Sequence, residues 1–330
     1  MNASLDSSLS SAISSFLTYK RSLDRKYRTE ERALQLFERF MHSNGIDRLE
    51  AVTSSGIDQF LASRSRPRPR SYNHLLGVLR NFFRWIVLQG AMTSNPVTAC
   101  TSTSTRHNTG QRRPYLFDLE QVRHLLEIVR GLPDNSMAPK RGVSYETMFA
   151  LLYGLGLRVG EVSRLTVGDV DLVQGRLLIE KTKFSKDRLI PFGPNMALRL
   201  KNYLSERFGA VLPEADHPLF SFIKGKRINP ETISQTFHHL VPMLGLKNQL
   251  GAAPPRLHDL RHSFAVRTLL RWYRSGINPN LRLLYLSTFL GHVDPSSTAV
   301  YLTITDELLD EANERFHDFA KSLLNEEGQP

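Results

Sequence analysis

Residues 95 to 113 contain almost no apolar side chains and are rich in Ser, Thr, Asn and Gly. This composition is typical of a linker, because such a stretch has little apolar surface to bury. The chain has 330 residues, so the sequence on each side is long enough to form its own hydrophobic core. We therefore expect a first domain at residues 1–100, a linker at residues 101–114 and a second domain at residues 115–330.

The overall composition is that of a globular protein, with 41% hydrophobic and 23% charged residues. No apolar run approaches the ~20 residues that a membrane-spanning helix needs, so we expect a soluble protein. The first fifteen residues lack the basic and apolar regions of a secretory signal, which favours the cytoplasm. The single cysteine, Cys100, excludes an internal disulfide and any metal site built from several thiolates.

The chain is strongly basic, with a net charge of +11 and a pI of about 9.9. A charge of this size favours a polyanionic partner, such as nucleic acid or an anionic membrane surface. Basic residues extend through both expected domains and the linker. Residues 306–330 are different, with eight acidic and two basic side chains.

The first domain has the apolar spacing of helices, with apolar residues at three- and four-residue steps around residues 34–41 and 75–87. Between these runs, residues 65–71 read Ser-Arg-Pro-Arg-Pro-Arg-Ser. The prolines predict an extended strip that presents Arg66, Arg68 and Arg70. This strip could lie along a phosphate backbone or be a solvated charged loop, and the sequence favours neither.

The second domain is also predicted to be mainly helical. Asp118 has the features of a helix N-cap, with Gln121 completing a capping box. The buried stripe expected on that helix is Leu119, Val122, Leu125, Leu126 and Val129. One segment has the features of a β-hairpin, with strands at residues 176–180 and 188–192 around a polar turn that contains three lysines.

Four sites of this domain combine into a possible active site. Arg158 follows a glycine-rich break near a helix start, with Glu161 one turn later, and Lys183 lies at the hairpin tip. His258 and Arg261 are three residues apart and would share one helix face. The fourth site is Gly291-His292, with Tyr301 nine residues further on. Each site alone is ordinary.

Together these residues meet the demands of phosphoryl transfer from DNA. The reaction needs a nucleophile, groups that stabilise charge on the non-bridging phosphate oxygens, and a proton for the leaving 5′ oxygen. A tyrosine, two arginines with two histidines, and a lysine could supply these parts. Arginine suits a phosphate because its planar fork can bind two oxygens at once.

The order and spacing of these residues resemble the tyrosine recombinases, the family of lambda integrase and the Xer recombinases. The matching residues are Arg158, Lys183, His258, Arg261, His292 and Tyr301, within residues 115–305. The resemblance implies a mainly helical catalytic domain with a small β-sheet, and a helical, SAM-like core-binding domain at residues 1–100 that binds DNA. Glu161 matches an acidic position that supports the first arginine.

The resemblance also implies a mechanism. Tyr301 would attack the scissile phosphate, form a 3′-phosphotyrosine and release a 5′ hydroxyl, with no metal or other cofactor. Aligning residues 186–191 with the family's hairpin makes Lys183 the general acid, with Lys181 and Lys186 as weaker candidates. The partners would be double-stranded DNA and further copies of the chain, four of them at synapsis, with no membrane.

Two regions leave questions open. The amphipathic, acidic residues 306–330 are expected to contact a neighbouring subunit, or else to fold back on their own domain. The segment from Arg261 to His292 is longer than in Xer-type members, which leaves the helix register at residues 272–282 undetermined. The amino-acid sequence of the last third resembles recombinases of mobile elements more than Xer proteins, so integration, excision or transposition is the expected task.

Three alternatives remain. His258 and His262 are four residues apart, as in a zincin helix, although Asp259 stands where a zincin has glutamate and Arg261 would place a cation beside the zinc. A type IB topoisomerase would share the tyrosine chemistry, and a DNA-binding regulator could keep the fold without activity. His238 and His239 are expected to be surface or packing residues on a helix that begins at Pro230.

Overall fold

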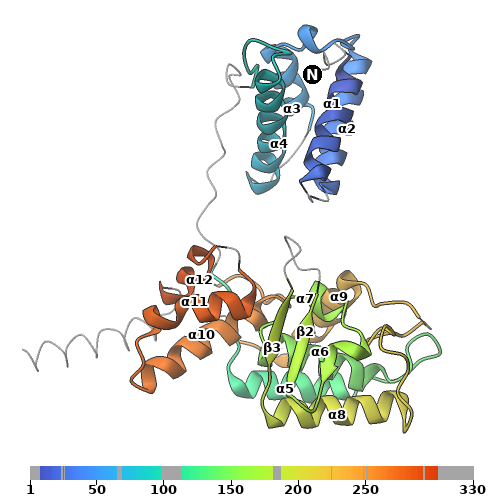
Figure 1. The fold of residues 1–330 in the computed structure, drawn as a ribbon, viewed down its shortest axis with the longest axis vertical. Helices are drawn as coiled ribbons and strands as arrows, with labels where there is room; N and C mark the ends of the chain where they lie inside the picture. The colour runs from blue at the N-terminus through green and yellow to red at the C-terminus, as the bar shows by residue number, and fades with distance from the viewer. Residues whose placement is uncertain are drawn as a thin grey trace, which may run out of the picture. The chain divides into compact units, whose positions relative to one another are not determined.

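The computed structural model describes residues 8–23, 25, 27–64, 69–97, 113–180, 187–223, 225–247, 249, 252–292 and 294–303. The chain divides into two compact units, residues 1–111 and residues 112–330, drawn in Figure 1. The division falls in the stretch whose composition indicates a linker, of which residues 98–112 lie outside the described part. None of the helices in the described part has both the length and the hydrophobicity needed to cross a membrane.

The first unit is helical, as its apolar spacing predicts. Its elements are α1 (Leu9–Ser22), α2 (Arg28–Ser43), η1 (Leu49–Ala51), α3 (Ser54–Ala62) and α4 (Pro69–Leu88). Aromatic side chains fill its core: the ring of Phe37 on α2 lies 5.2 Å from that of Phe60 on α3 and 5.9 Å from that of Phe83 on α4, measured between centroids. All three phenylalanines are fully buried.

The prediction of an extended strip at residues 65–71 is wrong at its C-terminal end. Pro69 and Arg70 are the first two residues of α4. Proline is tolerated in the first turn of a helix, because the N–H group that it lacks would have no partner there and its fixed φ suits the helix. Arg70 is exposed on this first turn, and Arg66 and Arg68 lie outside the described residues.

The second unit is mostly helical with one small sheet. Its elements are α5 (Leu119–Arg130), α6 (Arg141–Gly154), α7 (Val159–Val162), η2 (Val167–Asp169), β1 (Val170–Asp171), β2 (Arg176–Ile179), β3 (Arg188–Pro191), α8 (Pro194–Phe208), α9 (Pro230–Leu240), η3 (Val241–Leu244), α10 (Asp259–Arg274), α11 (Pro279–Leu290), α12 (Ser296–Ala299) and η4 (Val300–Thr303).

Helix α5 begins where the sequence predicts. The Asp118 carboxylate accepts a hydrogen bond from the backbone N–H of Gln121 at 2.8 Å, and the Gln121 side chain accepts one from the N–H of Asp118 at 3.2 Å. This capping box is confirmed. The predicted buried stripe is wrong at Leu119, which is exposed, because the first residue after the cap lies at the rim of the core.

The small sheet contains the predicted hairpin. Strands β2 and β3 pair in antiparallel fashion with Leu177 opposite Ile190, and both side chains are fully buried. Strand β1 adds a third antiparallel strand on the other side of β2. The sequence did not predict β1 because a strand of two residues has no readable alternation. The lysine-bearing tip, residues 181–186, lies outside the described residues.

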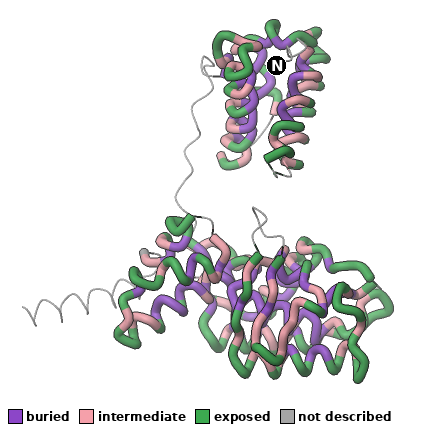
Figure 2. Tube along the Cα trace, viewed as in Figure 1, coloured by how far each residue is buried: buried purple, intermediate pink, exposed green. Residues whose placement is uncertain are grey.

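Two hydrophobic clusters hold the second unit together. The larger one joins α5, α6, α8 and α9 with the sheet, and Figure 2 shows buried stretches running through the middle of the unit. The smaller one forms where α10, α11 and η4 meet, the elements coloured orange to red in Figure 1. It contains Leu269, Leu290 and Tyr301. Tyr301 is therefore positioned by apolar packing between helices that the sequence separates by tens of residues.

Candidate active site

Arg158 lies at a tight turn between α6 and α7. Gly156 in this turn has a φ of +60°, and a Cβ atom there would lie 2.5 Å from the ring of Phe264 on α10. Only glycine fits both the left-handed conformation and this close approach. The turn therefore packs directly against α10, and it places Arg158 at the N-terminus of α7 beside that helix.

The carboxylate of Glu161 binds two arginines. It accepts hydrogen bonds from Nη1 and the backbone N–H of Arg158 at 2.8 and 2.9 Å, and from Nη1 and Nη2 of Arg188 at 3.1 and 2.9 Å. Burial raises the pKa of Glu161, but the hydrogen bonds and charges of Arg188 and Arg158 outweigh it and lower the pKa to about 2. The carboxylate is therefore charged at neutral pH and fixes both guanidinium groups.

The C-terminal end of α11 gathers three arginines. Gly291 ends the helix in the left-handed conformation, with a φ of +69°. Each of the last three carbonyls accepts a hydrogen bond from a different arginine: Phe289 from Nε of Arg188 (3.0 Å), Leu290 from Nη2 of Arg261 (2.7 Å) and Gly291 from Nη2 of Arg158 (2.8 Å). The final carbonyls of a helix lack helical partners and carry the negative end of its dipole, so they suit cations.

Arg261 lies on α10 and is only 1% exposed. Its guanidinium donates to the carbonyls of Gly156 at 2.6 Å and Leu290, and to Nε2 of His292 at 2.9 Å. Burial and the charge of Arg158 lower the pKa of Arg261 to about 10, so it stays charged at neutral pH. Because these three acceptors are neutral, the positive charge of Arg261 is available to an anion.

His292 follows the end of α11 and is bound on both sides of its ring. Its Nε2 accepts from Arg261, so the neutral ring carries its proton on Nδ1, which donates to Oγ1 of Thr298 at 2.7 Å. Burial and the charges of Arg261 and Arg158 lower the pKa of His292 to about 4. The ring is therefore neutral at neutral pH in the free protein.

The other two histidines lie one helical turn apart at the start of α10. The rings of His258 and His262 meet edge to face, 4.7 Å between centroids. Burial, followed by His262 and Arg261, lowers the pKa of His258 to about 3. Burial also lowers the pKa of His262 to about 4, although Asp259 acts in the opposite direction.

Tyr301 lies in η4 and is 4% exposed. Its Oη is 2.8 Å from Nδ1 of His262, and its ring is nearly parallel to that of His292, with centroids 6.4 Å apart. Burial raises the pKa of Tyr301, and the charges of Arg261 and Arg158 partly offset this. The phenol is therefore protonated at neutral pH in the free protein.

The structure thus brings five of the six sequence-predicted residues into one network: Arg158, His258, Arg261, His292 and Tyr301. Glu161 joins this network through its hydrogen bonds with Arg158. The sixth residue, Lys183, lies outside the described residues, as do Lys181 and Lys186. His238 and His239 are exposed on α9, as expected of surface residues.

Residues 116–307 match the family model described as the phage integrase family. The chain belongs to the phage integrase family. It is 33% identical over 92% of its length to y4rB of Sinorhizobium fredii, a protein named as an integrase or recombinase, and covers 95% of that protein. It is 28% identical to the tyrosine recombinase XerC of Proteus mirabilis, with 95% of each chain covered.

Solved structures share the fold of this chain at low sequence identity. The Tn1549 transposon integrase, solved with transposon right end DNA, has a TM-score of 0.66 at 16% identity and covers 95% of this chain and 99% of its own. A lambda integrase dimer bound to a COC′ core site has a TM-score of 0.62 at 19% identity, covering 89% of this chain and 77% of its own. The resemblance to the tyrosine recombinases and the mainly helical fold class predicted from sequence are confirmed.

Three residues of this network were missed by the sequence reasoning. Arg188 begins β3, where alternation places it on the same face as the buried Ile190. That alternation was a usable signal. His262 was recognised only as part of a zincin-like pattern, and Thr298 is one of many threonines. Nothing in the sequence indicates that these two contact Tyr301 and His292.

The zincin alternative does not fit the geometry of this site. Both carboxylate oxygens of Asp259 bind Arg256, through its backbone N–H at 2.9 Å and its Nη2 at 3.2 Å. Nδ1 of His262 binds the phenol of Tyr301. Among the residues that the structure describes, no group of three or more His, Cys, Asp or Glu side chains could bind a metal ion.

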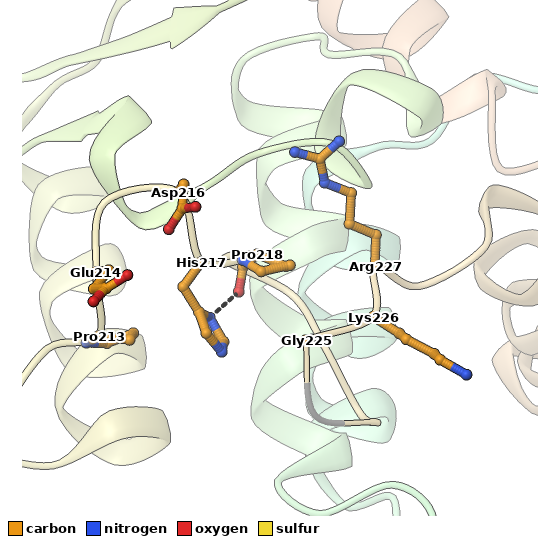
Figure 3. Close-up of a pocket in the computed structure, with 8 residues that line it drawn as sticks. All are labelled: Pro213, Glu214, Asp216, His217, Pro218, Gly225, Lys226 and Arg227. Atoms are coloured by element: carbon orange, nitrogen blue, oxygen red, sulfur yellow. Dashed lines mark hydrogen bonds between the residues drawn. The ribbon is translucent and has the colours of Figure 1, made fainter.

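A separate cavity of about 990 Å³, drawn in Figure 3, lies away from this network. Its described lining includes Glu214, Asp216, His217, Lys226 and Arg227. The His217 ring is engaged locally, with Nδ1 2.9 Å from the carbonyl of Pro218. The lining has both signs of charge, unlike the cationic network around Tyr301.

Proposed function

We propose that this protein is an active site-specific DNA recombinase that cuts and rejoins DNA strands through a covalent 3′-phosphotyrosine at Tyr301. The observation that carries the proposal is the buried network in which Arg158 and Arg261 share the end of α11 and the Tyr301 phenol lies beside His262 and His292. Glu161 is the one carboxylate bound among Arg158, Arg188 and Arg261, which leaves the combined charge of these four groups positive. A scissile phosphate supplies the matching negative charge.

Each residue has a role in this proposal. Arg158 and Arg261 bind the non-bridging oxygens of the phosphate, and His258 supplies a further hydrogen bond to them. His292 does so in the tautomer that carries its proton on Nε2, once the phosphate has displaced Arg261 from that nitrogen. The phenolic oxygen of Tyr301 attacks phosphorus, and the 5′ oxygen leaves with a proton from Lys183. The phosphodiester energy is kept in the tyrosine linkage, so a 5′ hydroxyl of a partner strand can reverse the step without a nucleotide.

The geometry favours an active enzyme over a regulator that has lost activity. A regulator would have no need to keep a neutral tyrosine, a neutral His292 and a buried, charged Arg261 in contact with one another. The family match and the relatives named as integrases or recombinases also favour strand exchange over the relaxation chemistry of a type IB topoisomerase.

The rest of the chain is assigned by the same proposal. The first unit is the SAM-like core-binding domain, in which Arg66, Arg68 and Arg70 contact the DNA backbone. Copies of the chain assemble on double-stranded DNA, as a tetramer at synapsis, and residues 306–330, outside the described part, make the contact between subunits. The protein acts on the DNA of a mobile element, in integration, excision or transposition. It works in the cytoplasm.

The direct test is covalent attachment to DNA. The purified protein is incubated with random-sequence duplexes and denatured, and protein-linked DNA is recovered and sequenced to define the site. A duplex with this site and a nick a few nucleotides 3′ of the scissile phosphate then serves as the nicked substrate, because the released fragment diffuses away and the adduct accumulates. Failure to recover any linked DNA would contradict the proposal.

Cleavage of the nicked substrate is expected to continue in excess EDTA. Arg158 and Arg261, with the hydrogen-bonding histidines, supply the charge stabilisation that a metal ion provides in other nucleases. The measurement is the rate of adduct formation after chelation, compared with the rate after Mg²⁺ or Zn²⁺ is restored. Loss of the adduct in EDTA and its return with either metal would count against this mechanism.

Replacing Lys183 with alanine is expected to slow cleavage of normal DNA by about 10²- to 10⁴-fold, the usual contribution of a general acid. The same variant should cleave at close to the wild-type rate when the leaving oxygen is replaced by sulfur, since a thiolate departs without a proton. Lys181→Ala and Lys186→Ala are the matched controls. Rescue by sulfur in one of these instead would move the role to that lysine.

A further inference from the structure

His262 contacts the reacting oxygen of Tyr301, which also interacts with the side chain of Arg261. Its Nδ1 lies 2.8 Å from the phenolic Oη, and the two ring centroids are 5.5 Å apart. His262 follows Arg261 directly on α10, and Tyr301 is fixed against the same helix by the cluster that includes Leu269 and Leu290. Both partners of this hydrogen bond are therefore held by packed elements.

We propose that, in the recombinase proposed above, His262 is a further catalytic residue whose Nδ1 takes the phenolic proton as Tyr301 attacks the phosphate. A phenol can donate as well as accept, and it can pass its proton to His262 only in the tautomer whose Nδ1 is unprotonated, so that tautomer is the productive one. Burial keeps the imidazole neutral at neutral pH, so its lone pair is available. The distance is within the range required of a general base.

The step balances in protons and electrons. As the bond between Oη and phosphorus forms, the O–H bond of Tyr301 breaks and its proton moves to Nδ1 of His262. The bond between phosphorus and the 5′ oxygen breaks, and that oxygen takes a proton from the general acid. In rejoining, the incoming 5′ hydroxyl returns its proton to the general acid, and the phenolate that leaves recovers its own from His262.

The surroundings of His262 act in both directions on a temporary positive charge. Burial, Arg256 and Arg261 oppose the imidazolium, whereas Asp259, three residues earlier on the same helix, favours it. Binding of the phosphodiester monoanion at Arg261, and then formation of the more highly charged phosphorane, would weaken the opposing field of that arginine. The proton acceptor thus becomes more basic when the substrate is in place.

The other two histidines are engaged elsewhere. Both ring nitrogens of His292 are occupied, Nε2 by Arg261 and Nδ1 by Thr298. The His258 ring packs against the ring of His262 at the N-terminus of α10. In the described part of the site, His262 is thus the histidine placed to receive the phenolic proton.

The test measures single-turnover cleavage of the nicked substrate from pH 6 to pH 9 for wild type, His262→Ala and His262→Gln. At neutral pH we expect both variants to be slower by about 10²- to 10⁴-fold, with DNA binding unchanged. The rate of His262→Ala should rise about tenfold per pH unit, because only phenolate formed in solution can then attack. Glutamine can hydrogen-bond the phenol but cannot take its proton, so His262→Gln should be as slow as His262→Ala at neutral pH and should show the same rise with pH.

His239→Ala, which removes an exposed histidine of the same unit, is the matched control and should cleave at the wild-type rate. Wild-type rates in His262→Ala, recovery of the rate in His262→Gln, or a pH profile parallel to that of the wild type would each overturn the inference. If His262→Ala does not fold, the larger glutamine variant decides. Absence of any adduct from the wild type would instead overturn the proposed function itself.

Discussion

Tyr301→Phe is expected to abolish covalent attachment to the nicked substrate, by on the order of 10⁴-fold or more, while leaving DNA binding close to that of the wild type. The substitution removes the attacking oxygen but keeps the ring, which packs in the cluster between α10 and α11. The lost hydrogen bond to His262 should cost only about 0.5–1.5 kcal/mol of stability. The fold and the cationic network should therefore remain.

The measurement is a gel that resolves the protein-linked DNA from free DNA after denaturation, paired with a binding assay on the intact site. Tyr285→Phe is the matched control, because Tyr285 is 70% exposed on α11 and should retain full adduct formation. An adduct of wild-type yield in Tyr301→Phe would assign the nucleophile to another residue.

Glu161→Gln is expected to destabilise the second unit by about 3 kcal/mol at neutral pH. The ordinary pKa of 4.5 falls to about 2 in the folded protein, and about 1.4 kcal/mol accompanies each unit. The substitution also leaves the guanidinium groups of Arg158 and Arg188 in a partly buried site without their counter-charge. Asp171→Asn is the matched control: its ion pair with Arg176 lies near the surface and is screened by solvent, so its loss should cost far less stability than that of Glu161.

The pH dependence gives an independent check of this carboxylate. Because the folded pKa of Glu161 is depressed, its stabilisation is present above about pH 4.5 and is lost as the pH falls toward 2. Urea unfolding can be followed by the fluorescence of Trp272 on α10, in a Trp85→Phe background that removes the other tryptophan. The wild type should lose more stability than Glu161→Gln between pH 5 and pH 2, and equal losses would contradict the assignment.

The sequence predicts the site through residues with distinctive chemistry, and it misses those whose role depends on contacts across the fold. A tyrosine, two arginines and two histidines in a fixed order identify the family because the reaction needs each of them. Arg188 reaches Glu161 and α11 from a strand, 101 residues before the carbonyl of Phe289. No local pattern in the sequence encodes that contact.

The fold was predictable to a similar depth. Helices with regular apolar spacing and the hairpin were predicted from sequence, because their periodicities are local. The errors occur at the ends of helices. Arg70 was expected in an extended strip but belongs to α4, and Leu119 was expected to be buried but is exposed just after the helix cap. At these positions chain geometry and the edge of the core matter more than residue type.

The end of α11 explains how the longer segment between Arg261 and His292 is accommodated. Helix α10 runs to Arg274 and α11 begins at Pro279, so residues 272–282 comprise two helix ends and a short turn. The three arginines bind the carbonyls of residues 289–291, which fixes the last turn of α11 and not the first. Differences in chain length among relatives can therefore accumulate at residues 275–278, whereas a one-residue insertion within residues 286–291 would rotate the final carbonyls by about 100° and displace all three arginines together.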